Sequence, residues 1–129
     1  MNKYYVLEYL YRDAGNFKAF GKILVFGNIS EDYICEIKKY LEAGEFFVAE
    51  QVNIPTLYSQ LWEYSNGPTI ADHAFHEFLL IRLASEQEIE SMDLWGETSV
   101  LLDTFRKASQ QSWDCLQSVH CAVFLYDSI

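Results

Sequence analysis

The 129-residue chain is poor in basic residues, with nine Lys and Arg against nineteen Asp and Glu and a formal net charge of −10. A sequence-independent grip on a nucleic-acid backbone needs a stripe of positive charge, so we expect no direct backbone binding. The acidic excess is larger in the second half of the chain. There it includes the closely spaced residues Glu86, Glu88, Glu90, Asp93 and Glu97. Such a run is typical of a solvated helix face and, less often, of a docking site for a basic partner.

Cysteine and long apolar runs are scarce as well. The three cysteines, Cys35, Cys115 and Cys121, are odd in number and have no C-x-x-C spacing, which argues against a disulfide framework and a zinc ribbon. No apolar run reaches about 18 residues, and Glu8 interrupts the stretch that a signal peptide would need. We therefore expect reduced thiols, a cytoplasmic location and no membrane contact.

Several catalytic and nucleotide-binding motifs are missing. The sequence contains no G-x-G-x-x-G, no Gly-Lys-Ser/Thr and no G-x-S-x-G pattern. A phosphate cradle and a hydrolase serine elbow are therefore unsupported, and we expect no cofactor.

What is present suits one globular domain over residues 1–129, because half of the residues are hydrophobic and no linker divides the chain. The apolar segment 109–129 has an open role: a strand, a core helix and a dimer arm all fit its composition.

The order of predicted elements is ββαβαβαα. The strands are expected at 3–12, 17–26, 45–52 and 73–84, and the helices at 30–44, 57–64, after Ser85, and at 98–108. The loop 13–16 predicts that the first two strands form an antiparallel hairpin. This order indicates an α+β fold with an antiparallel or mixed sheet of about four strands and helices mainly on one face.

Neither face of the predicted hairpin is plainly polar, because tyrosines and phenylalanines occupy both sets of alternating positions. The excess apolar surface could lie under the C-terminal segment, in a homodimer, or against a flat ligand. We expect a homodimer.

Polar residues gather where the predicted strands begin and end, and these form a candidate ligand-binding rim. Its members are Tyr11, Arg12, Asn16, Lys18, Glu50, Gln51, Asp72, His73, His76 and Glu77. Cations, imidazoles and carboxylates together suit a polar molecule with an anionic part. The alternative is a set of structural ion pairs, with Arg12 held by Asp13 or Glu50.

A histidine beside a carboxylate is also material for acid–base chemistry and metal ligation. In a strand, however, His73 and His76 point to opposite faces and His73 and Glu77 lie roughly 13 Å apart. We therefore predict no metal site in this segment.

Three segments of the sequence, residues 9–18, 44–52 and 67–78, resemble segments of other proteins. They resemble segments of a group of small bacterial hypothetical proteins, with YRDAxN(F/Y)K, EFFxAEQV and DHxFHEF patterns. The resemblance covers about residues 4–108 and implies neither a fold nor an activity.

The sequence therefore favours a small acidic cytosolic binding or inhibitor protein that acts through a polar and aromatic sheet rim. A mobile element could encode such a protein as a ligand sponge or partner inhibitor. The alternative is a small enzyme that uses His73 or His76 with Glu77 or Glu50, and holds an anionic substrate with Arg12 or Lys18.

Overall fold

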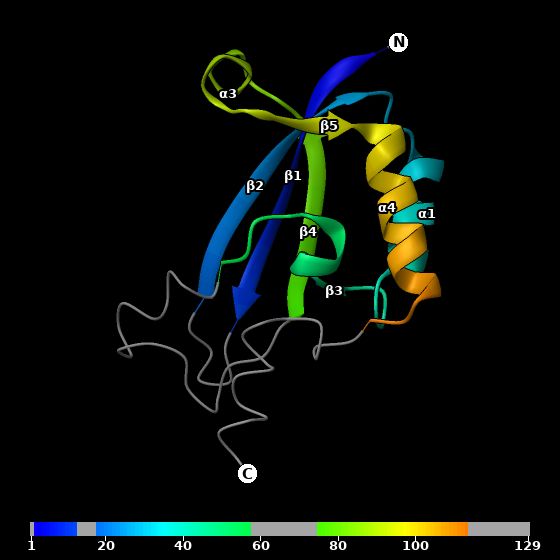
Figure 1. Ribbon diagram of the computed structural model, residues 1–129. Helices are drawn as coiled ribbons and strands as arrows, with labels where there is room; N and C mark the ends of the chain where they lie inside the picture. Colours follow the sequence, from blue (N-terminus) through cyan, green and yellow to red (C-terminus); the bar gives the residue numbers. More distant parts are fainter. Residues whose placement is uncertain (1, 13–17, 58–74, 114–129) are drawn as a thin grey trace.

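The computed structural model describes residues 2–12, 18–57 and 75–113 (Figure 1). The elements in these ranges are β1 (Lys3–Arg12), β2 (Lys18–Gly27), α1 (Glu31–Tyr40), β3 (Phe46–Val48), the 3-10 helix η1 (Ala49–Val52), β4 (Phe75–Leu83), α3 (Glu86–Ser91), β5 (Leu94–Glu97) and α4 (Thr98–Gln110). The α+β class is confirmed.

The described strands form one mixed sheet in the order β3-β4-β1-β2-β5. The predicted hairpin is confirmed, because β1 and β2 pair antiparallel from Lys3 opposite Gly27 to Arg12 opposite Lys18. β4 and β3 add antiparallel on one side, whereas β5 adds parallel to β2 on the other. Figure 1 shows the sheet curling, with β5 crossing in front of the central strands.

The expectation of about four strands was too low, because the sequence pattern missed β5. This strand has four residues, too few to show a clear alternation. Its conformation depends on pairing with β2 and on Trp95, whose Nε1–H donates a 2.8 Å hydrogen bond to the Asn53 carbonyl. Both contacts come from distant parts of the sequence.

The two faces of the sheet are covered differently. The helix face carries Leu7, Tyr9 and Tyr11 of β1 and packs beneath α1 and α4, which contribute Ile37 and Phe105 to the same buried cluster. We call the opposite side the outer face. α3 stands on that side (Figure 1), so the expectation that the helices lie mainly on one face holds for α1 and α4 only.

Two helices, α1 and α3, begin at serine N-caps. Ser30 accepts a hydrogen bond from the Tyr33 amide at the start of α1, as expected for an N-cap serine. Ser85 and Glu88 form a reciprocal capping box at the start of α3, which follows Ser85 as expected. In α4 one face, formed by Leu101, Phe105 and Ala108, is buried.

The predicted strand 45–52 is wrong in its second half. Extended pairing with β4 stops at Val48, and the chain turns through η1 to Asn53, which has a φ of 58°. The turn places Ala49 and Val52 in the core, which a continued strand at the sheet edge would not achieve. The predicted helix 57–64, the loop 13–16, the start of the strand at 73–74 and most of the segment 109–129 lie outside the described residues.

The central position of β1 explains why its sequence does not alternate between apolar and polar residues. Val6 on the outer face and Leu7 on the helix face are both fully buried. Among the described residues, no helix is long and apolar enough to cross a membrane.

Candidate functional site

The structure divides the predicted rim between the two faces of the sheet. Tyr11 pairs with His76 on the helix face, whereas Arg12 pairs with Lys18 on the outer face. Asn16, Asp72 and His73 lie outside the described residues. Because side chains on opposite faces cannot line one pocket, His76 and Arg12 do not form a common site.

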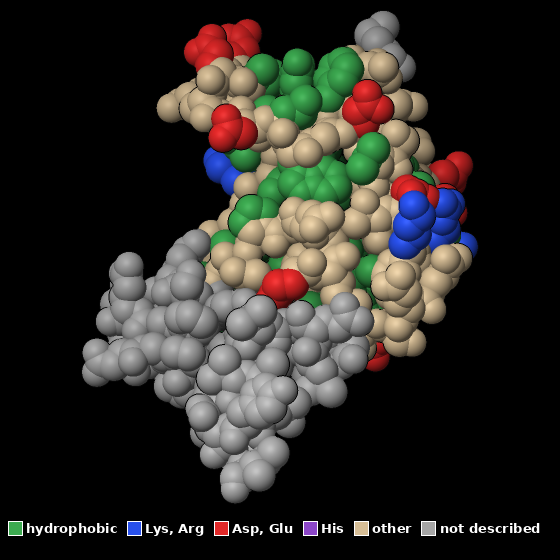
Figure 2. Space-filling model, viewed as in Figure 1, with side chains coloured by type: hydrophobic (Ala, Val, Ile, Leu, Met, Phe, Trp, Pro, Cys, Tyr) green, Lys and Arg blue, Asp and Glu red, His purple; other side chains and the backbone are tan. Residues whose placement is uncertain are grey.

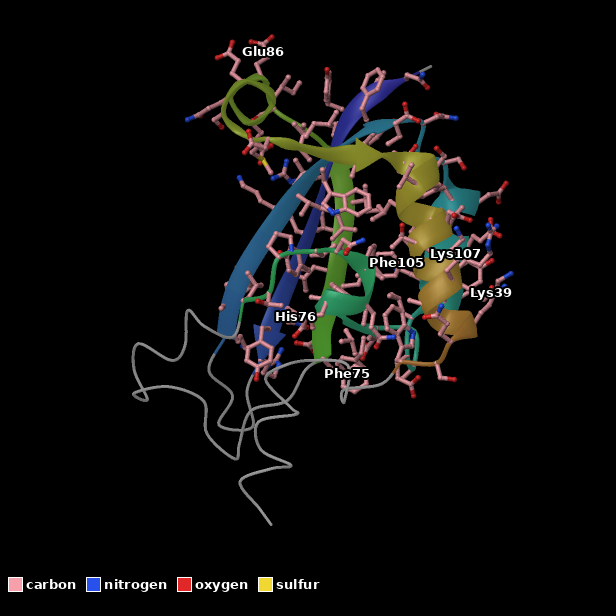
Figure 3. All side chains as sticks on the ribbon, in the orientation of Figure 1. Lys39, Phe75, His76, Glu86, Phe105 and Lys107 are labelled. Atoms are coloured by element: carbon pink, nitrogen blue, oxygen red, sulfur yellow. The ribbon has the colours of Figure 1, made fainter. Side chains whose placement is uncertain are left out.

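His76 belongs to the packed interior. Its side chain is fully buried, and its Nε2 accepts a 3.0 Å hydrogen bond from the Leu57 amide. The rings of Tyr11, Phe47 and Tyr9 lie 5.2, 5.9 and 6.0 Å from the imidazole centroid. Figure 3 shows His76 at the lower end of the core. With Nε2 engaged and the ring buried, this histidine packs in the core and holds the backbone of Leu57.

Structural contacts are made by three further rim residues, Arg12, Glu77 and Gln51. The Nε–H of Arg12 donates to Glu77 at 3.1 Å, so Arg12 does take part in a structural ion pair, and the expected partner Asp13 lies outside the described residues. Glu50 and Gln51 lie on η1 and not at the end of a strand. The Gln51 side-chain amide donates to the Ser112 carbonyl at 3.3 Å.

Two hollows that described residues line lie away from the predicted rim. One of about 260 Å³ lies at the start of α4 and is lined by Phe26, Gly27 and Thr98, among others. A shallow groove of about 420 Å³ runs along α4 beside Val100 and Arg106. The volume of the first hollow is below the usual range for small-molecule pockets, about 300 to 1,000 Å³. The second is a shallow groove that is open to solvent.

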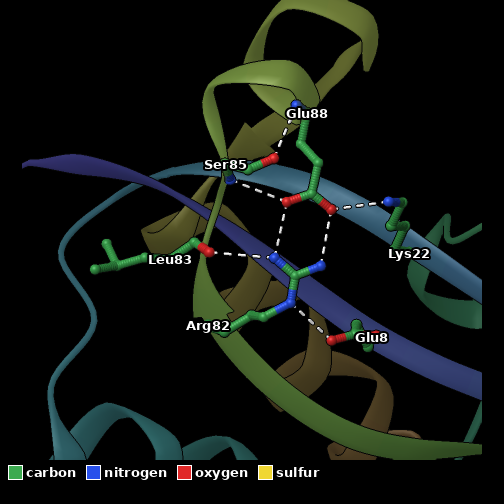
Figure 4. Close-up of polar contacts among 6 residues, drawn as sticks. All are labelled: Glu8, Lys22, Arg82, Leu83, Ser85 and Glu88. Carbon is green, nitrogen blue, oxygen red and sulfur yellow. Dashed lines mark hydrogen bonds and ion pairs between the residues drawn. The ribbon is translucent and has the colours of Figure 1, made fainter.

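The best-defined polar arrangement is on the outer face, and we call it the Glu88 clamp (Figure 4). Its members are Glu8, Lys22, Arg82, Ser85 and Glu88. Both terminal nitrogens of Arg82 donate to the two carboxylate oxygens of Glu88 at 2.8 Å. The Nε–H of Arg82 donates to Glu8, and Lys22 donates to Glu88, both at 2.8 Å.

The clamp joins β1, β2 and β4 to α3. The Arg82 guanidinium, followed by Lys22 and the Ser85 amide, holds the pKa of Glu88 well below its usual range. The hydrogen bonds that Arg82 donates to Glu88 and Glu8 raise the pKa of Arg82. Arg82 and Glu88 are both ionised and are joined by two parallel hydrogen bonds, a geometry that makes an ion pair strong and directional. The clamp therefore fixes α3 in one position on the sheet.

The sequence contained only part of this signal. Ser85 and Glu88 have the spacing of a capping box, and Glu8 faces Lys22 once the hairpin register is known. Arg82, however, lies six residues before Glu88 with a change from strand to helix between them. No fixed spacing rule connects two residues across such a change.

α3, the start of β1 and the segment 93–97 with β5 present an exposed acidic and apolar surface, which we call the α3 surface. Its members are the hydrophobic residues Tyr4, Ile89 and Leu94 and the carboxylates Glu86, Glu90, Asp93 and Glu97. Their hydrophobic side chains are 36%, 37% and 51% exposed, respectively. Figure 2 shows hydrophobic side chains gathered at this end of the molecule, with acidic side chains on either side.

The carboxylates of the α3 surface are not neutralised by the nearby cations. Among the described residues, Glu86, Glu90, Asp93 and Glu97 form no ion pair, because Lys22 and Arg82 are engaged by the clamp. The sequence has no Lys or Arg between Arg82 and Arg106. In the described part of the chain, no three His, Cys, Asp or Glu side chains are grouped so that they could hold a metal ion.

Comparison of the chain with protein-family models, with curated proteins and with solved structures finds no match.

Proposed function

We propose that this chain is a binding protein that docks a basic, partly apolar protein surface on its α3 surface, and thereby inhibits or sequesters that partner. The observation that carries the proposal is the placement of exposed hydrophobic side chains beside carboxylates whose neighbouring cations are already engaged.

Each half of this surface supports a different part of binding. Ile89 and Leu94 can lose water against apolar side chains of a partner, which supplies most of the affinity in a protein interface. Glu86 and Glu90 attract Lys and Arg over distance, which raises the association rate and selects against acidic partners. The clamp supports both, because an immobile α3 loses little conformational freedom on binding.

This proposal moves the predicted binding surface from the strand rim to α3. The acid–base enzyme considered from sequence has less support, because His76 is buried and Arg12 lies on the other face in contact with Glu77. A small-ligand sponge, a mobile-element origin and a cytoplasmic location stay predictions from the sequence.

The test measures binding to a short fluorescein-labelled peptide in which Lys and Leu alternate, by fluorescence anisotropy. We expect saturable binding that weakens with added salt. The double substitution Glu86→Lys with Glu90→Lys should weaken it by about tenfold or more, because two attractions become repulsions.

The matched control is Glu42→Lys with Glu45→Lys, which changes the net charge equally in the turn between α1 and β3, where both residues are exposed. This control should leave binding nearly unchanged. Equal losses in the two double variants would show that net charge alone attracts the peptide, and would overturn the proposal. A peptide with Ser in place of Leu should bind more weakly, and equal binding would remove the apolar half of the argument.

A further inference from the structure

The α3 surface has an apolar centre between two acidic sides. Leu94 of β5 and Ile89 of α3 are 51% and 37% exposed. On one side α3 carries Glu86 and Glu90, and on the other side Glu97 stands at the far end of β5. Figure 2 shows acidic side chains on either side of the hydrophobic ones. A partner that fits this surface has apolar side chains in the middle and cations on both sides of them.

The pairing of the strands places the exposed side chains on one face. Leu94 pairs with Leu24 and Glu97 pairs with Phe26, which in turn pairs with Tyr4. Paired residues of neighbouring strands point to the same face of a sheet, so Tyr4, Leu94 and Glu97 all belong to the outer face. The Tyr4 and Phe26 rings contact each other with centroids 4.7 Å apart. This contact holds the Tyr4 ring in place before a partner binds.

The width of the surface matches that of a helix. Asp93 and Glu97 lie at the two ends of β5. A strand rises about 3.3 Å per residue, so the backbones of these two residues are at most about 13 Å apart. An α-helix with its side chains is about 10 to 12 Å across. A helix that crosses β5 over Leu94 can therefore bring cations to the carboxylates at both ends.

The positions of the carboxylates also distinguish a helix from an extended strand. Successive side chains of a strand point to opposite faces, so a strand that buries its apolar side chains turns its charged ones away from the surface. An amphipathic helix has an apolar stripe, and the residues that border the stripe point sideways. Lysines at the border positions reach both acidic sides while the stripe covers Leu94 and Ile89.

The two acidic sides are held at a fixed separation. Lys22 of β2 donates to Glu88 of α3 at 2.8 Å, and β2 also pairs with β5, which ends at Glu97. A surface that already has its bound arrangement loses little conformational entropy on association. The α3 surface is therefore preorganised for a partner element of one width.

We propose that the partner docks an amphipathic basic helix on the α3 surface. Its apolar stripe lies against Leu94, Ile89 and Tyr4, and its Lys or Arg side chains lie beside Glu90 on one side and Glu97 on the other. This inference rests on the proposed function and specifies the form in which the basic, partly apolar partner binds.

Fluorescence anisotropy with two labelled peptides of equal length and composition tests the helix. In the helical peptide Leu recurs at i, i+3, i+4 and i+7 and Lys fills the other positions, whereas in the extended peptide Lys and Leu alternate. We expect the helical peptide to bind about tenfold more tightly, and its helical circular dichroism signal to increase on binding. Equal affinities, or tighter binding of the extended peptide, overturn the helix and leave the proposed function standing. If neither peptide binds, the proposed function itself is overturned.

Single substitutions test whether the bound helix reaches both acidic sides. Glu90→Gln and Glu97→Gln each remove one negative charge with little change in shape. Each should weaken binding of the helical peptide by about threefold or more. The control Glu42→Gln, at an exposed residue between α1 and β3, should bind as wild type does. Wild-type affinity in Glu97→Gln would show that the helix does not span the surface, and would overturn this placement.

The apolar centre is tested with two residues of equal exposure. Leu94→Ser should weaken binding of the helical peptide by about threefold or more, because the apolar stripe loses its main contact. The matched control Val100→Ser changes a residue of α4 that is also 51% exposed, and should leave the affinity unchanged. Circular dichroism of each variant checks that the fold is retained. Equal losses in the two variants would contradict docking over β5.

Discussion

The two faces of the sheet place similar polar groups in opposite situations. On the helix face, His76 and Tyr9 are 0% and 1% exposed, and each makes a hydrogen bond that holds the segment before residue 58. On the outer face, Lys22 and Arg82 have side chains that are 46% and 39% exposed, and their charges are met by Glu88 and Glu8.

This difference shows that solvent access, more than residue type, decides what a polar side chain can do here. The His–carboxylate pattern of 72–77 looked chemical in the sequence, but His76 turns inward and Glu77 turns outward. The acidic run of 86–97 looked like an ordinary solvated face, but the clamp fixes it beside exposed hydrophobic side chains.

The comparison predicts that substitutions on the helix face cost the most stability. Phe105 is fully buried between Phe47 and Trp113, with centroids at 5.3 and 5.9 Å. Phe105→Ala should lower the free energy of unfolding by about 3 to 5 kcal/mol, a large share of a typical total of about 5 to 15 kcal/mol. Urea denaturation measures it. The control Phe20→Ala, at a residue 63% exposed on the outer face, should cost about 0.5 kcal/mol or less.

A second substitution asks whether His76 serves structure through its hydrogen bond. His76→Phe keeps an aromatic ring but leaves the buried Leu57 amide without this acceptor. The free energy of unfolding should fall by about 1 to 3 kcal/mol. The neighbouring Glu77→Gln, which weakens a half-exposed ion pair with Arg12, should cost about 0.2 to 1 kcal/mol. An unchanged denaturation midpoint for His76→Phe would contradict the structural role.

Tyr9, on the helix face, is expected to make the stability of the protein depend on alkaline pH. Its hydroxyl donates to the Pro55 carbonyl at 2.6 Å, and burial raises the pKa of Tyr9 from 10.0 to about 12. Since the unfolded chain loses this proton first, the stabilisation is complete below pH 10 and is lost as the pH rises toward about 12.

The free energy of unfolding of the Tyr9→Phe variant should be lower than that of wild type by about 0.5 to 1.5 kcal/mol at neutral pH. Its deficit relative to wild type should shrink between pH 10 and about 12 in denaturation experiments. A deficit that stays constant over this range would rule out selective stabilisation of the protonated hydroxyl.

The smallest effect on global unfolding is expected on the outer face, at Glu88. In Glu88→Gln, Lys22 and Arg82 can regain water because their side chains are partly exposed. We expect instead a local effect, in which the Ile89 amide of α3 and the Met92 amide at its C-terminal end exchange hydrogen faster than in wild type.

The pH dependence of Glu88 has the opposite sign to that of Tyr9. Because the folded-state pKa is lowered from 4.5, the clamp stabilises fully above pH 4.5 and loses this contribution as the pH falls. The difference in amide hydrogen-exchange rate between wild type and Glu88→Gln should therefore become smaller at acidic pH. Glu90→Gln, on the exposed side of α3, is the control and should exchange as wild type does at every pH.

Local patterns in the sequence determined the elements that hold themselves together over short distances. The hairpin of β1 and β2, the Ser30 cap, the box of Ser85 with Glu88 and the buried face of α4 all depend on residues close in the chain. Each could be predicted because its hydrogen bonds or packing follow from fixed spacings.

Only the tertiary structure decided which alternating face became the core, and therefore which side His76 takes. A period-two pattern defines two faces but does not distinguish them when both carry tyrosines and phenylalanines. It also decided the existence of β5, the turn at η1 and the partners of Arg82. These depend on contacts such as Trp95 with Asn53 and Arg82 with Glu8, 42 and 74 residues apart, which no local spacing encodes.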